Sequence, residues 1–312
     1  MITYSSPAKV ILSGEHAVVY GKPALVCAID RRLKFTVFDR SSQNGNGKDG
    51  KIVLMITDKV KQYLKDKKIK FTDKSFDFKI NSQIPVGRGL GSSAALSVAA
   101  TAAFLKFYTG YSFEKETINN LAYQIEKHFH KNPSGVDNTA SCFGGLIYYR
   151  REFEFLKNIA SLNFKIPKKI EENLFLIDSG APLETTARMV ELVGKMYNKK
   201  PSYIEQILND IEKTTKRMVV AIVKEDVDFF QQTLLDNEIL LEILGVVSQK
   251  TKKLLKSLSQ FGVGKITGAG GSKQGSGFIL FYATDKEGLI NFLKDKKISY
   301  FKFVSDYKGL DD

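Results

Sequence analysis

The chain has 312 residues, of which 43% are hydrophobic and 26% charged, and this composition is typical of a globular protein with one large domain or two of ordinary size. No segment approaches the roughly 20 apolar residues of a membrane span, and residues 1–10 lack the basic region and long apolar core of a secretory signal. The formal charge of +13 suggests nucleic-acid binding, but the lysines stand in short runs interrupted by acids, without interleaved aromatic residues. The sequence therefore predicts a cytoplasmic protein that binds neither nucleic acid nor a membrane.

The first third of the sequence indicates strands separated by turns. These segments are rich in β-branched or aromatic residues and are bounded by Gly, Pro, Asn or Asp. The predicted strands are 9–12, 24–29, 33–38, 51–57 and 76–80. Residues 41–50 (SSQNGNGKDG) are predicted as a polar loop between two of them.

Residues 87–93 (GRGLGSS) open an apolar run, 94–108, that is predicted as a buried helix ending at Gly110. Alternating glycines let backbone amides approach a ligand, and a helix start offers unpaired amides and a positive dipole end to an anion. Ser92 and Ser93 add hydroxyls for a phosphate or a metal ion. The loop matches neither a P-loop nor a dinucleotide fingerprint, so an ordinary glycine-rich turn capped by serine is an equal alternative.

A second helix is predicted after Ser112, which can serve as its N-cap, and Pro133 ends it. Its core face consists of apolar residues at helical spacing: Ile118, Leu121, Ala122, Ile125 and Phe129. A short third helix starts within 134–137, and a strand follows at 146–149.

Beyond Pro167, long amphipathic patterns dominate the sequence. The predicted helices are 184–197, 202–223, 226–244, 248–261 and one from Lys286. The predicted strands are 174–178, 264–267, 277–282 and 300–304. A soft boundary near residue 172 gives an α+β fold with two lobes, 1–172 and 173–312. The glycine-rich segment 267–271 (TGAGG) fits a hairpin turn, but two such loops in one chain favour phosphate binding.

Glu126 lies at the edge of the apolar face of the second helix. A carboxylate near a core needs a cation or a basic partner. A magnesium ion shared with a loop serine would serve, because Mg²⁺ takes few protein oxygens together with nucleotide phosphates. The alternative is a rim glutamate paired with Lys127 or His130.

Asp137 also has two interpretations. Ser134 and Asp137 fit a capping box, whereas an aspartate is also the group that accepts a hydroxyl proton in many kinases. Lys9 is either a surface charge or a cleft residue beside Asp137. Glu15 and His16 are equally ambiguous when each is considered alone.

Together these segments resemble the motifs of the GHMP kinase family, named for galacto-, homoserine, mevalonate and phosphomevalonate kinases. The three motifs are 7–21 (PAKVILSGEHAVVYG), 85–95 (PVGRGLGSSAA) and 265–271 (KITGAGG). Glu126 and 132–138 (NPSGVDN) match the mevalonate kinases among them, with the same internal spacing. The stretch LLDNEILLEILGV also resembles a helix of those enzymes.

The resemblance implies a fold and an activity. The N-terminal lobe, 1–172, would resemble domain 2 of ribosomal protein S5, and the C-terminal lobe, 173–312, would be ferredoxin-like. The activity would be phosphorylation of mevalonate on its 5-hydroxyl in isoprenoid biosynthesis, with ATP as co-substrate and Mg²⁺ as cofactor; a homodimer is compatible with it. The rival readings are a kinase or decarboxylase acting on a phosphorylated mevalonate, and a catalytically silent relative that binds a ligand.

The resemblance also implies roles for individual residues. Asp137 would be the base, with Lys9 stabilising the alkoxide and the phosphoryl charge. ATP would be bound by Ser82, Gly87, Arg88, Gly89, Leu90, Gly91, Ser92, Ser93, Gly268, Ala269 and Gly270. Mg²⁺ would be held by Ser93 and Glu126, and mevalonate would be contacted by His16, Glu15 and Thr185. One departure is 272–274 (SKQ), where the family usually continues with glycines; a second is Lys131, where a glycine is common.

Overall fold

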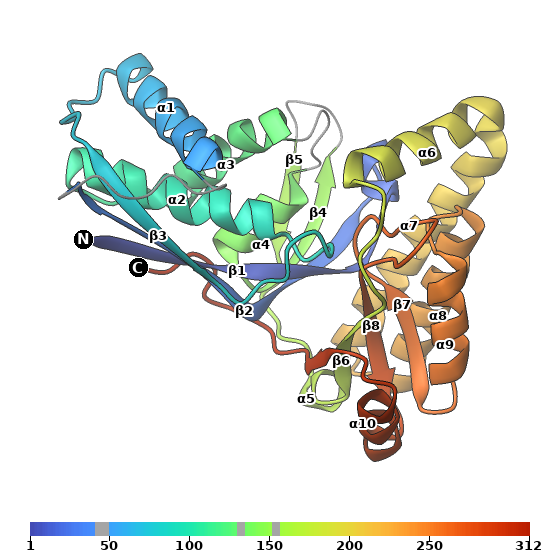
Figure 1. Cartoon of the computed structure of the whole chain (residues 1–312). Helices are drawn as coiled ribbons and strands as arrows, with labels where there is room; N and C mark the ends of the chain where they lie inside the picture. The colour runs from blue at the N-terminus through green and yellow to red at the C-terminus, as the bar shows by residue number, and fades with distance from the viewer. Residues whose placement is uncertain (41–49, 130–134, 152–156) are drawn as a thin grey trace.

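The computed structural model describes residues 1–40, 50–129, 135–151 and 157–312. Two lobes are visible in Figure 1: a first sheet covered by α1 to α4, and a second sheet with α6 to α10 around it. Within the described residues, no helix has both the length and the apolar character that a bilayer crossing requires.

The first sheet is built around one long strand, β2. The strands of this sheet are β1 (Ile2–Ser13), β2 (Ala24–Asp39), β3 (Phe76–Ser82), β4 (Leu146–Arg151) and β5 (Lys157–Ser161). β2 pairs antiparallel with β1 along most of its length, with β4 over residues 24–27 and with β3 over residues 33–39. The strands predicted at 24–29 and 33–38 are therefore parts of a single strand.

The helices of the first lobe pack on one side of this sheet (Figure 1). They are α1 (Gly50–Asp66), α2 (Ser92–Thr109), α3 (Lys115–Phe129) and α4 (Val136–Phe143), with a short 3₁₀ helix, η1 (Ala17–Tyr20). The predicted helix at 94–108 is confirmed as α2, which is buried almost all round and ends at Gly110, whose φ is 88°. Ser112 does not cap α3; its hydroxyl lies 3.0 Å from that of Tyr4. The predicted stop at Pro133 lies outside the described residues, as does the loop 41–49.

The strand predicted at 51–57 is wrong, because these residues form the start of α1. The buried apolar side chains of α1 recur every three or four residues: Val53, Ile56, Val60 and Leu64. The β-branched residues of the segment favoured a strand locally, but packing of this face against α2 and α3 decides for a helix.

The second lobe has the element order and sheet topology of a ferredoxin-like fold. Its strands are β6 (Leu174–Asp178), β7 (Gly262–Ile266), β8 (Phe278–Ala283) and β9 (Tyr300–Lys302), in the order β7-β8-β6-β9 and all antiparallel. Its helices are α6 (Thr186–Lys199), α7 (Pro201–Val223), α8 (Val227–Ile243), α9 (Gln249–Leu258) and α10 (Lys286–Asp295), preceded by the short α5 (Lys168–Glu171). The predicted helices and strands of this half are thus confirmed within a few residues at their ends.

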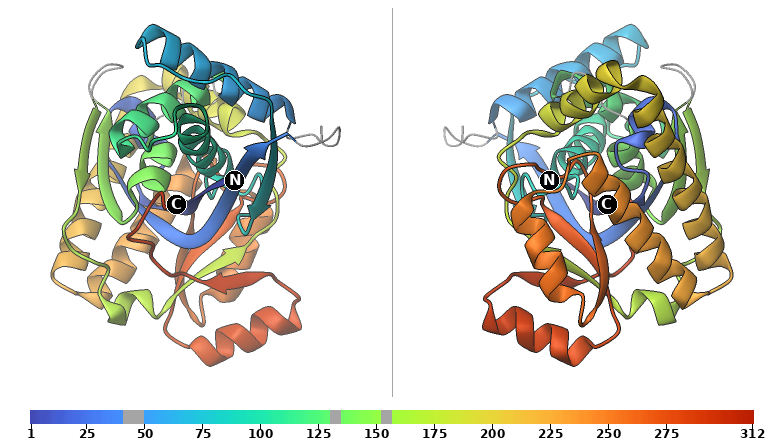
Figure 2. Two further views of the ribbon diagram at one scale, coloured as in Figure 1. Left: turned by 90° about the vertical axis from the view of Figure 1, so that its left-hand side faces the viewer. Right: turned by 90° about the vertical axis from the view of Figure 1, so that its right-hand side faces the viewer.

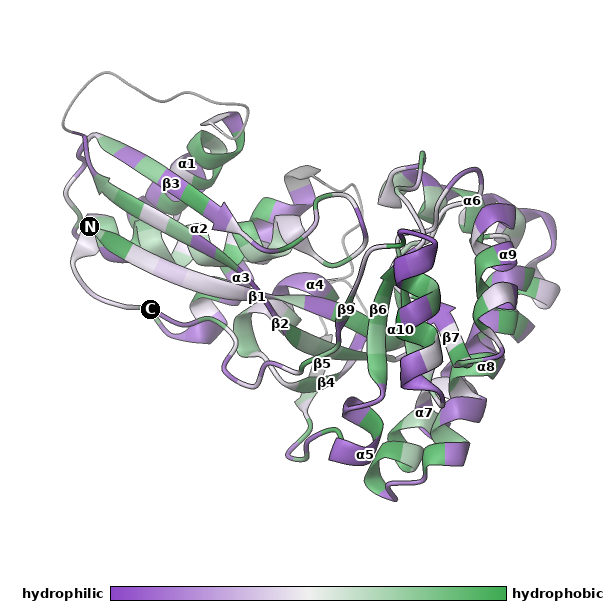
Figure 3. Cartoon of the chain, turned by 60° about the horizontal axis from the view of Figure 1, so that its bottom comes forward, coloured by the Kyte–Doolittle hydropathy of each residue, from purple (hydrophilic) through white to green (hydrophobic). Residues whose placement is uncertain are grey.

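The two lobes share apolar packing through β6, whose successive side chains point to opposite faces. Leu174 and Leu176 join the core that fills the first lobe, while Phe175 and Ile177 join a second core under α6 and α9. In Figure 3 the ribbon of β6 is coloured as hydrophobic along most of its length. A strand buried on both faces lacks alternating polarity, and this accounts for its short continuous apolar run.

Residues 304–312 leave the second lobe and return to the first. The backbone of Ser5 on β1 exchanges two hydrogen bonds with Asp311, of 2.7 and 2.9 Å, and both termini lie close together in Figure 2. We therefore propose that the second lobe ends at about residue 303, and that 304–312 belong with the first lobe rather than with 173–312.

Candidate active site

The three sequence motifs meet around β1. The backbone N–H of Lys9 donates to the carbonyl oxygen of Leu90 in the first glycine-rich loop, at 3.1 Å. The backbone N–H of Ile11 donates to the hydroxyl of Thr267 in the second loop, at 3.0 Å, although these residues are 256 positions apart. β1 therefore joins the two loops.

The two glycine-rich loops also touch each other directly. Gly89 and Gly268 both have positive φ, 83° and 86°, and a Cβ added to Gly268 would lie 3.1 Å from the carbonyl oxygen of Gly89. Gly270 is packed in the same way, because a Cβ there would lie 2.1 Å from the carbonyl oxygen of Val246. Glycine is needed at these positions for backbone packing, independently of any ligand.

The N-terminus of α2 has the features of an anion site. Its N-cap is Gly91, with φ 76° and no capping side chain, so its first backbone N–H groups have no partner within the helix. Ser92 and Ser93 stand at the first helical positions, and Gly91 packs against the side chain of Lys9, since a Cβ on Gly91 would lie 3.1 Å from Lys9 Cγ. The N-terminus of α2, with its unpaired amides and positive dipole end, thus lies beside the aliphatic part of the Lys9 side chain.

Lys9 and Asp137 form an ion pair at this point, with Lys9 Nζ 3.1 Å from Asp137 Oδ1. The lysine side chain is only 3% exposed, whereas the aspartate side chain is 40% exposed. α4 has Gly135 as its N-cap, which places Asp137 at the second helical position rather than the third that a capping box needs. The capping-box interpretation is therefore disfavoured, although Ser134 itself lies outside the described residues.

Glu126 is buried and accepts a hydrogen bond from the hydroxyl of Ser97 at 3.0 Å. Burial and, to a smaller extent, the nearby charge of Asp137 raise its pKa to about 7, although hydrogen bonds from Ser97 and Ser93 act in the opposite direction. Glu126 is therefore a core residue beside the loop and not a rim glutamate. Of the two partners considered for a rim glutamate, Lys127 and His130, the histidine lies outside the described residues.

The carboxylate of Glu126 and the hydroxyl of Ser93 are hard oxygen donors, as Mg²⁺ prefers. Within the described part of the chain, no group of three or more His, Cys, Asp and Glu side chains is arranged to hold a metal. A metal ion at this position would therefore take few ligands from the protein and the rest from phosphates and water, which is the usual pattern for Mg²⁺ at nucleotides.

Glu15, which the resemblance assigns to the substrate, is buried in the structure. Glu15 forms an ion pair with Lys265, and both side chains have no exposed surface. Lys265 Nζ also donates to the carbonyl oxygen of Ile266 at 2.7 Å, and burial raises the pKa of Glu15. A carboxylate sealed in this way stabilises the link between β1 and β7 and has no surface for a ligand.

His16 is buried between the first and third motifs. It adopts φ 59°, ψ −44°, a strained conformation for a residue other than glycine, and its Nε2 lies 3.0 Å from the carbonyl oxygen of Ala269. Burial lowers its pKa to about 4, so the ring is neutral near pH 7. A neutral ring that donates from Nε2 leaves Nδ1 as an acceptor, and Nδ1 has no partner among the described residues.

Thr185 is the N-cap of α6 and accepts a hydrogen bond from the backbone of Arg188. Beside it, Glu184 Oε1 accepts a hydrogen bond of 2.5 Å from the hydroxyl of Ser272. The unusual segment 272–274 is thus anchored to the start of α6, and the carbonyl of Gln274 also accepts from Ser248.

The remaining predicted nucleotide contacts differ in accessibility. Ser82 is exposed at the end of β3, and Leu90 is buried, so that only its backbone can reach a ligand. Arg88 forms an ion pair with Asp178 at the end of β6 and so connects the loop to the second lobe.

The sequence interpretation missed several polar residues near the site. Ser97 follows Ser93 by one helical turn, and this spacing could have identified it. Glu238 on α8 is buried and accepts a hydrogen bond from the backbone N–H of Ile266 at 2.8 Å. No local pattern marks Glu238, because its partner is distant in the sequence.

Comparison with known proteins identifies the family of this sequence. The model of the GHMP kinases N terminal domain matches residues 53–145. A mevalonate kinase of Pyrococcus abyssi is 32% identical over 304 residues, which cover 87% of this chain and 86% of the relative.

Two solved structures share the fold. The mevalonate kinase of Methanococcus jannaschii superposes with a TM-score of 0.78 at 23% identity, over 97% of this chain and 98% of that chain. The phosphomevalonate kinase of Streptococcus pneumoniae, in complex with phosphomevalonate and AMPPNP, gives the same TM-score of 0.78 at 17% identity, over 98% of this chain and 100% of that chain. The fold alone therefore does not distinguish these two substrates.

Proposed function

Because this chain belongs to the GHMP kinase family, we propose that it transfers the terminal phosphoryl group of ATP to the 5-hydroxyl of mevalonate. The activity follows from its likeness to mevalonate kinases over most of its length. The observation in the structure that carries the proposal is the Lys9–Asp137 pair beside the open N-terminus of α2.

Asp137 acts as the general base in this proposal. Its carboxylate is partly exposed and can accept the hydroxyl proton while the substrate oxygen bonds to the terminal phosphorus. The bond from that phosphorus to the ADP oxygen breaks in the same transfer. Lys9 keeps its ammonium group against Asp137 and stabilises the negative charge that develops on the transferred group.

The first glycine-rich loop binds the phosphates. The unpaired N–H groups at the start of α2 and the hydroxyls of Ser92 and Ser93 face an anion here. The second loop contributes through Gly268, Ala269 and Gly270, which are fixed against Gly89, His16 and Val246 and so give the site a rigid wall.

Ser93 and Glu126 are the residues that would hold Mg²⁺. When bound, the ion neutralises phosphate charge during the transfer. The ionised form of Glu126 is needed for this, so metal binding and deprotonation of a group with a pKa of about 7 are coupled.

His16 and Thr185 are the proposed contacts to mevalonate. His16 offers Nδ1 as a buried acceptor for a substrate hydroxyl, and Thr185 lies at the exposed start of α6. Glu15 is left out of this set because it is sealed against Lys265.

A substrate panel tests the proposal. ATP consumption is measured with mevalonate, phosphomevalonate, diphosphomevalonate, homoserine and galactose in parallel, and the product of the mevalonate reaction is identified. We expect turnover with mevalonate to give the 5-phosphate. Clear activity on phosphomevalonate with none on mevalonate would overturn the assignment.

A further inference from the structure

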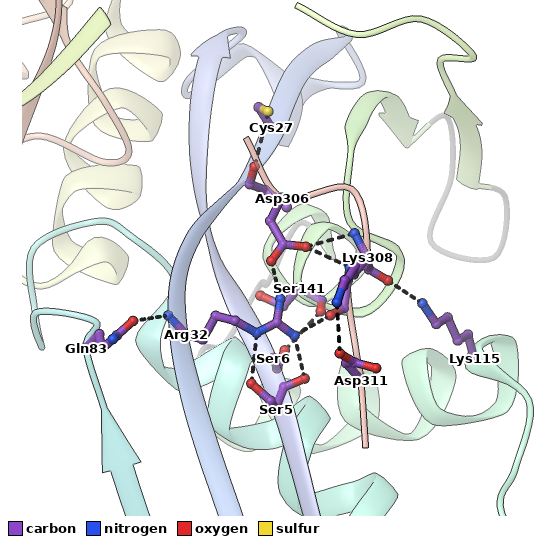
Figure 4. A network of polar contacts seen from close by, with 12 residues as sticks. Ser5, Ser6, Cys27, Arg32, Gln83, Lys115, Ser141, Asp306, Lys308 and Asp311 are labelled. Carbon is purple, nitrogen blue, oxygen red and sulfur yellow. Dashed lines mark hydrogen bonds and ion pairs between the residues drawn. The ribbon is translucent and has the colours of Figure 1, made fainter. Parts of the chain in front are cut away.

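Residues 304–312, which we call the return segment, are held to the first lobe by a network of polar contacts (Figure 4). The segment bonds to β2 where Asp30 N–H donates to the carbonyl oxygen of Val304, at 2.8 Å. It bonds to β1 through the paired backbone groups of Ser5 and Asp311. The return segment therefore spans two neighbouring strands.

Arg32 on β2 is the centre of this network. Its guanidinium group pairs with the carboxylate of Asp306 and donates to the hydroxyl of Ser5 at 2.8 Å. It also donates to the carbonyl oxygens of Ser5 and Gly309, at 2.9 and 2.6 Å. Both side chains of the pair are largely buried, at 15% and 6% exposure, so these hydrogen bonds are shielded from competing water.

Asp306 shapes the return segment itself. Its Oδ1 accepts hydrogen bonds from the backbone N–H groups of Lys308 and Gly309, each of 2.9 Å. This turn presents Gly309, with φ 68°, to the C-terminal end of α4. A Cβ on Gly144 would lie 2.4 Å from the nitrogen of Gly309, so the two backbones are in direct contact.

α4 is thus fixed at its C-terminal end by the return segment and by β1. Leu310 N–H donates to the carbonyl oxygen of Cys142 at 2.9 Å, and the hydroxyl of Ser6 on β1 donates to the carbonyl oxygen of Ser141 at 2.9 Å. α4 has only 8 residues, and a helix this short is not stable by itself in water. Its position therefore depends on these contacts.

The same two elements carry the proposed catalytic pair. Lys9 follows Ser5 and Ser6 on β1, and Asp137 stands at the opposite end of α4 from Cys142. From this arrangement we propose that Arg32 and Asp306 are positioning residues, which hold α4 against β1 so that Asp137 stays aligned with Lys9. The inference rests on the proposed function, because it assumes that the Lys9–Asp137 pair performs the chemistry.

The test is a pair of substitutions in the full chain. Arg32→Ala is made alone and in an Asp137→Asn background, and kcat, both KM values and Tm are measured for each variant. Misplacing a reactive group by about 1 Å can cost on the order of 100-fold in rate, and we expect Arg32→Ala to lower kcat at least about tenfold. Because the α2 phosphate site does not depend on Arg32, the KM for ATP should change by less than about threefold.

The double variant separates positioning from general stability. If Arg32 acts through Asp137, Arg32→Ala should cause little further loss once the aspartate is replaced. A loss of kcat that is equal in both backgrounds, or a lower Tm with unchanged kcat, would overturn the proposal. Failure of the wild type to turn over mevalonate would instead contradict the proposed function.

Two further variants keep the test decisive if Arg32→Ala does not fold. Asp306→Asn retains the shape and the acceptor for the turn but removes the charge that Arg32 pairs with, and a kcat loss of several-fold that vanishes in the Asp137→Asn background is expected. Arg217→Ala is the matched control, because it breaks a surface ion pair of 3.0 Å with Asp236 and should leave kcat unchanged. Unchanged kcat in Asp306→Asn would overturn the role of the pair.

Discussion

Lys9 and Lys265 each form an ion pair with a carboxylate beside β1, but the two pairs differ in their surroundings. Asp137 of the Lys9 pair is 40% exposed. Glu15 of the Lys265 pair has no exposed surface, and neither has the lysine. A second carboxylate, Glu238, lies near the sealed pair, and burial raises its pKa to about 8.

The difference shows that burial decides what an ion pair can do. The partly exposed Asp137 can exchange protons and meet a ligand, while the ion pair of Glu15 and Lys265, with neither side chain exposed, holds chain segments together. Asp137 and Glu15 both belong to sequence motifs that resemble functional motifs of the family. The following substitutions test this division, beginning with the largest expected effect.

Asp137→Asn is expected to reduce turnover by about 100- to 10,000-fold, because the amide cannot accept a proton at neutral pH. Tm should stay within a few degrees of the wild-type value, and ATP should bind normally. The measurement is an initial rate, a thermal melt and an ATP titration on one preparation. A variant that melts much earlier yet keeps most of its turnover would identify Asp137 as a structural residue.

Glu15→Gln is expected to act on stability, because it leaves the ammonium group of Lys265 buried without its partner charge. Breaking a buried pair in this way costs about 3–5 kcal/mol, which corresponds to a fall in Tm of roughly 10 °C for a chain of this size. The KM for mevalonate should remain close to that of the wild type. Glu205→Gln, which removes a part-exposed partner of Lys22, is the control and should change Tm little.

The opposite result would contradict the interpretation of Glu15 and Lys265 as a structural ion pair. If Glu15→Gln raised the KM for mevalonate more than about tenfold at an unchanged Tm, Glu15 would contact the substrate.

Glu126→Gln should lower activity at least about tenfold and raise the magnesium concentration needed for half-maximal rate, because it removes a charge from the proposed metal site. In the wild type, this magnesium requirement should also rise as the pH falls below about 7, where Glu126 becomes protonated. The variant should lack this pH dependence. An unchanged magnesium dependence in Glu126→Gln would exclude it as a metal ligand.

Glu238→Gln should change Tm little near pH 5 and show a clear pH dependence above it. The folded-state pKa of Glu238, about 8, is raised above its ordinary value of 4.5, so the wild type loses stability as pH rises from 4.5 to 8. The glutamine keeps an acceptor for Ile266 N–H and does not titrate. Its Tm advantage over the wild type should therefore grow between pH 5 and pH 8, then level off. A constant difference across this range would contradict the raised pKa.

Local sequence patterns predicted most of the fold. The helices of the second lobe were predicted from their amphipathic patterns, and in the structure Asp226 and Ser248 cap two of them by accepting hydrogen bonds from the backbone of their own helices. Residues 51–57 were assigned wrongly because local β-branched content outweighed a helical period that becomes evident only when the pattern is extended to Leu64.

The candidate site was less accessible to the same reasoning. The resemblance to the GHMP kinase motifs indicated Lys9, Asp137 and Glu126, and the structure brings these three residues together. The sequence could not separate Glu15 from these three residues, because Lys265, the partner of Glu15, is 250 positions away. Local patterns report periodicity and capping, whereas burial beside a distant charge depends on how the lobes pack.

The return segment also has a consequence for how the chain folds. Arg32 and Asp306 are 274 positions apart, so the first lobe cannot complete its contacts until residue 306 has been synthesised. Contacts of such high sequence separation slow folding, since the loop between them must close first. During synthesis the bonds between Ser5 on β1 and Asp311 can therefore form only after the whole of the second lobe, which precedes residue 304, has been made.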